Sequence, residues 1–263
     1  MPAEPINETA VRQAVEQHGF AWHYRHHTES TNADVLRYQQ QHQREVVAVS
    51  EAQSAGRGRR GRQWLSPFAR NIYCTIGIAR EIPASRQGLL SIVTGLALCQ
   101  ALQQSADTIV GLKWPNDLLV DGRKLGGILI ESRPLGEASF YFAIGFGLNV
   151  YMSDKELAAI PQPATSLVQV AANEVDRTRV LITSINMVIR SIREFDHRAA
   201  PELVAEFARF DALHDRPIEV IAGDSRIRGI NRGITSTGQL QLETEQGIEI
   251  HSAAEISLRA VPD

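Results

Sequence analysis

The sequence has few of the residues on which disulfide-rich and metal-binding domains depend. Its 263 residues include two cysteines, Cys74 and Cys99, and these lack CxxC spacing. No run of histidines stands beside them at the intervals of metal ligands. This composition argues against both a disulfide framework and a zinc site, and it fits a reducing compartment.

Targeting signals and membrane-spanning stretches are also lacking. The opening "MPAEPINETAVRQAVEQHG" is acidic and polar, whereas a secretory signal is basic and then apolar. The longest apolar run, residues 88–102, is too short and too interrupted to cross a bilayer. We therefore expect a cytoplasmic protein with no membrane partner.

Acidic residues are missing from one long interval, between Glu51 and Glu81. The same interval contains Arg57, Arg59, Arg60, Arg62, Arg70 and Arg80. The formal net charge of the chain is only -3, so one surface is expected to be strongly positive on a near-neutral protein.

Most of these arginines lie in "AQSAGRGRRGRQW", residues 52–64. Its glycines permit close approach of the backbone to a ligand, and its guanidinium groups match carboxylate or phosphate oxygens in pairs. The spacing is not that of a Walker A loop. An RNA-binding tail of the arginine-glycine type is an alternative, but such tails lie in low-complexity sequence, and this loop lies between two predicted strands. We favour an anion pocket.

The hydrophobic pattern predicts helices and strands without a strict strand-helix-strand rhythm. Helices are expected at 8–18, 29–41, 88–104, 181–195 and 201–210. Strands are expected at 45–51, 72–78, 109–114, 126–131 and 140–145. The stretch "PNDLLVDGRK" is rich in turn formers and is expected to separate two of these strands. The mixture favours an α+β fold with a mixed β-sheet flanked by helices.

From Asp215 onward the pattern changes to short apolar alternations separated by "GD", "TG" and "QG". This spacing indicates a β-meander. We expect a boundary near Leu213, with one domain at 1–213 and a small β-barrel at 214–263. An extension of the main sheet fits less well because the linkers between the strands are so short.

The segment "LKWPNDLLVDGRKLGGILIE" contains further candidate site residues. Pro115 forces Trp114 out of helical geometry, so the chain turns and presents Asn116 and Asp117. Asp117 is a candidate Mg²⁺ ligand, because Mg²⁺ in nucleotide sites is held by one or two carboxylates plus phosphate oxygens. Lys124 follows a tight return and could lie over a transferring phosphoryl group. Taken alone, Lys124 is equally compatible with an ordinary exposed lysine.

A third segment, "AIGFGLNV", ends a predicted strand in Gly145 and Gly147. Two glycines on one face of a strand let a flat group approach the backbone, and Asn149 offers an amide for a base edge or a ribose. Glycines of this kind also serve strand packing alone.

These motifs, in this order, resemble those of the bacterial biotin protein ligases. The resemblance rests on "ESTN", "GRGRRGRQW", "KWPNDL", "RKLGGILIE", "GFGLNV" and "AEISLR", which together extend from Ser30 to Arg259. It implies a mixed sheet related to class II aminoacyl-tRNA synthetases, with an SH3-like barrel at the C-terminus. It also implies a two-step reaction: biotin and ATP form biotinyl-5'-AMP, and a lysine of a biotin carboxyl carrier protein then attacks the mixed anhydride.

The resemblance assigns residues to each part of that reaction. Biotin is expected to contact Ser30, Thr31, Asn32, Gln53, Gly56, Arg57, Gly58, Arg59, Lys124 and Gly127. ATP and the adenylate are expected to contact Arg57, Arg59, Arg62, Trp64, Asn116, Lys124, Asn149 and Arg259. Catalysis is assigned to Arg57, Arg59, Lys124 and Asp117, with Asp117 serving Mg²⁺.

Departures from the family pattern limit what carries over. Some bacterial members have a winged helix that binds an operator, and the short segment before Ser30 cannot hold one, so no DNA partner is expected. The chain has "KLGG" where some relatives have "KLAG", and residues 253–255 replace a glycine pair. A lipoate protein ligase and a non-enzymatic RNA-binding protein are the rival hypotheses. The sequence leaves a homodimer and the identity of the acceptor open.

Overall fold

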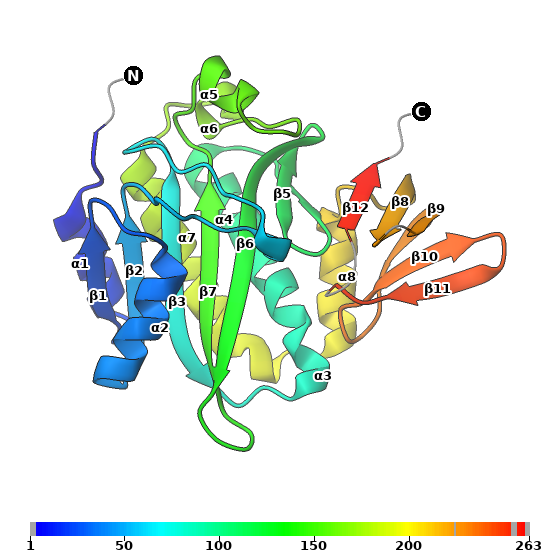
Figure 1. Ribbon diagram of the computed structural model, residues 1–263, viewed down its shortest axis with the longest axis horizontal. Coiled ribbons are helices and arrows are strands. Elements are labelled where there is room, and N and C mark those ends of the chain that lie inside the picture. The colour runs from blue at the N-terminus through cyan, green and yellow to red at the C-terminus, as the bar shows by residue number, and fades with distance from the viewer. Residues whose placement is uncertain (1–3, 224, 254–256, 261–263) are drawn as a thin grey trace.

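Seven strands form the main sheet of the computed structural model, which describes residues 4–223, 225–253 and 257–260. The strands are β1 (Ala21–Arg25), β2 (Val46–Ser50), β3 (Ile72–Arg80), β4 (Gly111–Lys113), β5 (Asp117–Val120), β6 (Arg123–Pro134) and β7 (Phe140–Leu148). Their spatial order is β1-β2-β3-β7-β6-β5-β4 (Figure 1). Only β1 and β2 pair in parallel, and the other neighbours are antiparallel, which confirms the mixed sheet.

Helices cover the two faces of this sheet unequally. The longer helices are α1 (Glu8–Glu16), α2 (Thr31–His42), α4 (Leu89–Ala106), α7 (Arg177–Glu194) and α8 (Ala200–Phe210). Short helical segments are η1 (Arg59–Gly61), α3 (Ala84–Gln87), α5 (Asp154–Ala158), α6 (Leu167–Val170) and η2 (Phe195–His197). Strand β2 shows how the faces divide, because Val47 and Val49 join the large core with α1, α4 and α7, whereas Val46 and Ala48 pack with Val35 of α2.

The most apolar helix, α4, is a core element. By length and composition, residues 84–106 could cross a membrane, but 78% of the most apolar window in that stretch is buried inside the molecule. Its buried residues belong to the same cluster as those of β3, β7 and α7. Burial against neighbouring elements explains why this helix lacks a polar face.

A second sheet follows α8. It is formed by β8 (Pro217–Ala222), β9 (Ser225–Ile234), β10 (Leu240–Thr244), β11 (Gly247–His251) and β12 (Ser257–Ala260), which we call the C-terminal sheet. Its order is β11-β10-β9-β8-β12, with antiparallel pairing throughout (Figure 1). Glycines 223, 238 and 247 have positive φ at its turns, as the spacing of the meander predicts.

Two strands differ from the sequence-based expectation: β1 (Ala21–Arg25), for which no strand was predicted, and β5. Residues 117–120, expected to be irregular, form the strand β5, and all four are buried. The turn that follows has φ of 49° at Asp121 and 73° at Gly122, which matches a two-residue hairpin between β5 and β6. Asp117 looks like a turn former in the sequence, but it pairs with Lys113 of β4 and Gly127 of β6.

A buried ion pair joins the end of β2 to α7 and to the N-terminal segment. Arg177 Nη1 lies 2.7 Å from Glu51 Oε2, and their side chains are 4% and 0% exposed. The other oxygen of Glu51 accepts hydrogen bonds from the Tyr24 hydroxyl and the Ile6 backbone amide, and Arg177 also donates to the Glu4 carbonyl. The pair therefore ties three parts of the chain together directly before the arginine-rich loop.

We predict that Arg177→Met destabilises the protein by about 3–5 kcal/mol, because it leaves a buried carboxylate without its cation. Urea unfolding measures the change. Arg190→Met, which breaks an exposed i,i+4 pair with Glu194, is the control and should leave the midpoint near that of the unchanged protein. Equal losses in the two variants would show that Glu51 does not depend on Arg177.

Candidate active site

Glycines on two neighbouring strands form a floor on the face of the sheet that carries α2. Gly127 of β6 pairs with Gly147 of β7. A Cβ atom at Gly147 would lie 2.7 Å from the Trp64 ring, and one at Gly145 would clash with the Asn32 side chain. The flat group expected beside "GFGLN" is thus Trp64 of this same chain. Glycine is required at both positions because other side chains fill the space of a Cβ.

An uncharged polar cluster lies at one end of this floor. The Thr75 hydroxyl lies 2.8 Å from Thr31 Oγ1 and 2.7 Å from Asn32 Oδ1. Gln53 Oε1 accepts a hydrogen bond of 3.0 Å from the Thr31 backbone amide. Ser30 is the N-cap of α2, so Thr31 and Asn32 occupy the first turn of the helix. The structure thus brings together the four residues that the "ESTN" motif and Gln53 predict, and it adds Thr75.

The entrance of the arginine-rich loop lies against this cluster. Gln53 Nε2 donates to Ser66 Oγ at 3.2 Å. Gly56 is buried beside them, and a Cβ there would lie 2.8 Å from Ser66 Oγ and 3.0 Å from Gln53 Nε2. Because these contacts leave no room for a side chain, Gly56 sets how closely the loop approaches Gln53.

The sequence did not single out Glu131 as a site residue. Asn32 Nδ2 donates to Glu131 Oε2 at 2.8 Å, and the Arg57 guanidinium lies 3.3 Å from Glu131 Oε1. Glu131 therefore joins the first turn of α2 to the arginine-rich loop. Its only sequence signal is its position as the last residue of "RKLGGILIE".

Backbone contacts shape the rest of the loop. Arg57 and Gln63 form an antiparallel bridge, and the Gly58 amide donates to the Arg62 carbonyl at 2.7 Å. Gly61 has a φ of 72°, a conformation that favours glycine. The side chains of Arg57 and Arg62 lie on the exposed side of the loop. The loop is thus folded back on itself.

Two lysines surround one buried carboxylate at the other end of the floor. Asp117 Oδ1 lies 2.7 Å from Lys124 Nζ, and Asp117 Oδ2 lies 3.5 Å from Lys113 Nζ. Burial raises the pKa of Asp117, but attraction and hydrogen bonds from the two lysines outweigh it, so the pKa lies below its ordinary value. Lys124 Nζ also lies 5.4 Å from the centre of the Trp64 ring. Of these three groups, which have a net positive charge, Lys124 adjoins the indole.

Arg59 and Asn116 bring the loop to this cationic end. Arg59 Nη1 donates to Asn116 Oδ1 at 3.3 Å, and its other terminal nitrogen donates to the Ala253 carbonyl. Asn116 Nδ2 in turn donates to the Ile128 carbonyl at 2.7 Å. Burial lowers the pKa of Arg59, yet a guanidinium stays charged at neutral pH.

Two expected nucleotide contacts have other surroundings. Asn149 is 2% exposed, and its amide nitrogen donates to the Thr165 carbonyl at 3.0 Å. Asn149 therefore shapes the segment after β7. The sequence did not indicate this structural role. The backbone of Arg259 lies in β12 opposite Glu219, and its side chain lies outside the described residues. Residues 254 and 255, which belong to the stretch that replaces a glycine pair of the relatives, also lie outside them.

The surroundings of Asp117 do not fit the expected metal ligand. Each of its oxygens faces an ammonium group, so the carboxylate is already neutralised. Lys113, which the sequence did not single out, is the neighbour that decides this point.

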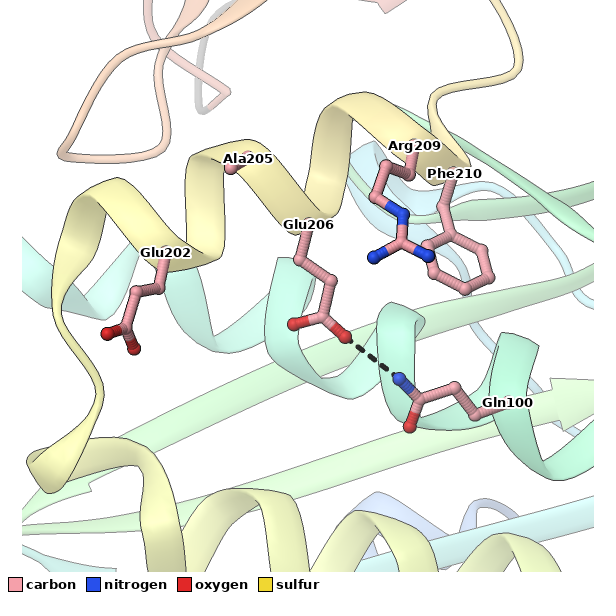
Figure 2. A pocket seen from close by; sticks show the side chains of 6 residues that line it. All are labelled: Gln100, Glu202, Ala205, Glu206, Arg209 and Phe210. Atoms are coloured by element: carbon pink, nitrogen blue, oxygen red, sulfur yellow. Dashed lines mark hydrogen bonds between the residues drawn. The ribbon is translucent and has the colours of Figure 1, made fainter.

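Two surface hollows differ in their relation to these residues. The larger, about 370 Å³, lies between α4 and α8 and is lined by Gln100, Glu202, Ala205, Glu206, Arg209 and Phe210 (Figure 2). Its Glu206 already accepts hydrogen bonds from Gln100 and Arg198. This hollow lies among the helices on the face of the sheet opposite α2. The smaller, about 300 Å³, is lined in part by Gln53 and Ser54 and adjoins the polar cluster. Chemistry, rather than size, identifies the site.

The chain matches known protein families over much of its length. Residues 23–149 match the biotin/lipoate A/B protein ligase family, and residues 213–259 match the biotin protein ligase C terminal domain. A biotin--[acetyl-CoA-carboxylase] ligase of Mycobacterium tuberculosis is 32% identical, over 96% of this chain and 95% of that protein. The chain belongs to the biotin protein ligase family.

Other relatives of this ligase differ in length. The bifunctional ligase/repressor BirA of Salmonella typhimurium is 37% identical over 81% of this chain, and the match spans 67% of that protein. The fold of the ligase is similar to that of a biotin protein ligase from Aquifex aeolicus, solved in complex with biotin and ATP. The TM-score is 0.75 at 24% identity, over 92% of this chain and 99% of that one.

We predict that Gly147→Ala displaces Trp64, because the new Cβ would lie 2.7 Å from the indole. The indole should become more accessible to a fluorescence quencher than in the unchanged protein. Gly136→Ala is the control, since a Cβ there meets nothing within 4 Å. Unchanged quenching in Gly147→Ala would mean that Trp64 does not rest on the floor.

A second prediction concerns the pKa of Asp117. Its carboxylate stabilises the fold above the ordinary pKa of 3.8, and this contribution is lost as the pH falls through the lower folded value. Lys113→Met removes one cation, so the pKa of Asp117 should rise toward its ordinary value, and the loss of stability should be smaller and complete at a higher pH. Carboxyl NMR titration measures the shift, and an unchanged pKa would exclude Lys113 from its surroundings.

Proposed function

We propose that this ligase attaches biotin to a lysine of a biotin carboxyl carrier protein, through a biotinyl-5'-AMP intermediate made from ATP. ATP-dependent ligation of biotin follows from the family to which the chain belongs. The acceptor is supported by relatives in Mycobacterium tuberculosis and Paracoccus denitrificans that are named biotin--[acetyl-CoA-carboxylase] ligases. Neither the lipoate ligase nor the RNA-binding hypothesis is favoured by these relatives.

The first step brings together two anions. A carboxylate oxygen of biotin attacks the α-phosphorus of ATP, and the bond to pyrophosphate breaks. Charge repulsion opposes this attack, so positioned cations should provide most of the catalysis. The single observation that carries the proposal is the position of Lys124, held at 2.7 Å by Asp117 and adjoining Trp64 over the glycine floor.

We propose that biotin lies with its ring at the uncharged end of the floor. Its ureido group needs neutral donors and acceptors, which Thr31, Asn32 and Gln53 supply next to Ser30. The carboxylate then extends over Gly127 toward Lys124. A buried polar site of this kind rejects a ligand that leaves its groups unpaired, which favours biotin over lipoate.

The arginine-rich loop is proposed to bind the reacting carboxylate and the phosphates. Arg57 pairs with Glu131 in this structure, so binding of an anionic ligand there requires it to exchange one carboxylate for another. Arg59 lies beside Asn116 and the Asp117 cluster, which supports a role at the α-phosphate. Gly56 and Gly58 shape this loop, and Arg62 is placed at its exposed end to meet the outer phosphates.

The nucleotide is proposed to lie on the far side of Trp64, with Asn116 and Arg259 at its border. Asn149 acts by shaping the wall rather than by direct contact. Because Asp117 is neutralised by two lysines, we propose that Mg²⁺ arrives with ATP as part of the substrate. Asp117 then serves to hold Lys124 in place.

In the second step the acceptor amine attacks the acyl carbon and AMP leaves with the bonding electrons. We propose a division of the chain near residue 213, supported by the start of the second family match there and of β8 at Pro217. A cytoplasmic location is supported by the two free, buried cysteines. A repressor function is not part of the proposal.

The direct test is pyrophosphate exchange into ATP, run with biotin and lipoate side by side. We expect exchange with biotin and none above background with lipoate. Exchange that depends on lipoate alone would replace the proposal with a lipoate ligase, and no exchange with either acid would remove adenylation.

Lys124→Ala should reduce exchange by about 10²- to 10³-fold, because it removes one positioned cation at the reacting centre. Lys155→Ala, a lysine on the surface helix α5, is the control and should keep full activity. Circular dichroism confirms that both variants fold. Full exchange in folded Lys124→Ala would exclude this lysine from the mechanism.

A further inference from the structure

The C-terminal sheet contacts the main sheet through a buried tryptophan. Trp114, at the end of β4, is 1% exposed, and its indole nitrogen donates to the Gly238 carbonyl at 2.9 Å. Trp114 stands two residues before Asn116 and three before Asp117, both in the cationic end of the site. The hydrogen bond therefore joins the C-terminal sheet to the turn that presents these two side chains.

The acceptor side of this bond is a rigid turn between β9 and β10. Gly238 has a φ of 81°, and its amide donates to the Thr235 carbonyl at 3.0 Å. The hydroxyls of Thr235 and Thr237 lie 2.9 Å apart, and Thr235 also accepts from the Gln239 amide. A Cβ at Gly238 would lie 3.2 Å from the backbone of Gly88, so the turn is packed against the start of α4.

The turn between β4 and β5 has a second anchor, on α4. Ser91 Oγ donates to the Pro115 carbonyl at 2.7 Å. Inside the turn, the Asn116 amide donates to the Lys113 carbonyl at 3.1 Å. Residues 113–116 are thus fixed from outside by α4 and by the C-terminal sheet, and from inside by their own hydrogen bond.

A third contact reaches the β4–β5 turn from the arginine-rich loop. Arg59 donates both to the Ala253 carbonyl, which lies after β11, and to Asn116 Oδ1. The C-terminal sheet therefore reaches Asn116 by two independent routes, one through Trp114 and one through Arg59. The polar cluster of Thr31, Asn32 and Thr75 belongs to α2 and β3, at the other end of the floor.

We infer that Trp114 is a positioning residue for the nucleotide half of the site, and that it acts by fixing the β4–β5 turn to the C-terminal sheet. It holds the β4–β5 turn so that Asn116 and the Asp117–Lys124 pair face the reacting phosphate. The biotin half does not depend on this contact. The inference rests on the proposed function for its kinetic test only.

The test compares Trp114→Phe with Trp22→Phe in the full-length chain. Trp22 also donates an indole hydrogen bond, at 3.2 Å to Glu8, but it lies on β1 at the opposite edge of the sheet. In Trp114→Phe we expect KM for ATP in the exchange reaction to rise about tenfold, the size of a lost buried hydrogen bond. The Kd for biotin, measured by calorimetry without ATP, should stay within about twofold. Trp22→Phe should leave both constants unchanged.

A merely structural role predicts a different result. If Trp114→Phe changed KM for ATP and Kd for biotin by equal factors, or changed neither in a folded protein, the inference would be overturned. Thr235→Val, which removes the hydroxyl that holds the Gly238 turn, is the milder variant should Trp114→Phe fail to fold, and it should show the same split between the two constants. Equal changes or none in Thr235→Val would overturn the inference equally.

Hydrogen exchange provides a readout that needs no activity. Amides of residues 111–120 should lose protection in Trp114→Phe and keep it in Trp22→Phe. If the unchanged protein showed no biotin-dependent exchange of pyrophosphate, the proposed function would fail, and this comparison would still decide whether Trp114 holds the turn. Equal protection in the two variants would contradict the inference.

Discussion

Two missing Cβ atoms on β7 determine where the site can form. Gly145 and Gly147 have no side chains on this face of the sheet. Asn32 and Trp64 occupy the space that those side chains would fill. The polar cluster, the indole and the paired lysines are arranged along this bare strip. A side chain at either position would separate the first turn of α2 or the arginine-rich loop from the sheet.

Charge is distributed along the same strip with a clear direction. One end has the neutral donors and acceptors of the polar cluster, with the Glu131–Arg57 ion pair beside them, and the other has Lys113 and Lys124 around a carboxylate whose pKa they lower. Arg59 of the loop lies at the second end. A ligand with a neutral head and an anionic tail therefore has one favourable orientation, which places its carboxylate beside the phosphate-binding groups.

Local motifs predicted much of this arrangement, because glycine spacing and N-caps act over a few residues. The helix beginning after Ser30, the strand of "AIGFGLNV" and the β-meander all follow from such signals. The strand β5 was missed because its residues look like turn formers. Its strand conformation comes from pairing with β4 and β6. Glu131 and Lys113 were missed for a related reason: their importance comes from partners that only the folded sheet brings near. Asn149 is buried against Thr165, which no local pattern reveals.

We propose that a carboxylate oxygen of biotin attacks the α-phosphorus of ATP on this floor. Biotin labelled with ¹⁸O in its carboxylate follows this oxygen through a single turnover with ATP and a carrier domain. The released AMP should contain one heavy oxygen and the pyrophosphate none. Unlabelled AMP, or label in the pyrophosphate, would contradict it.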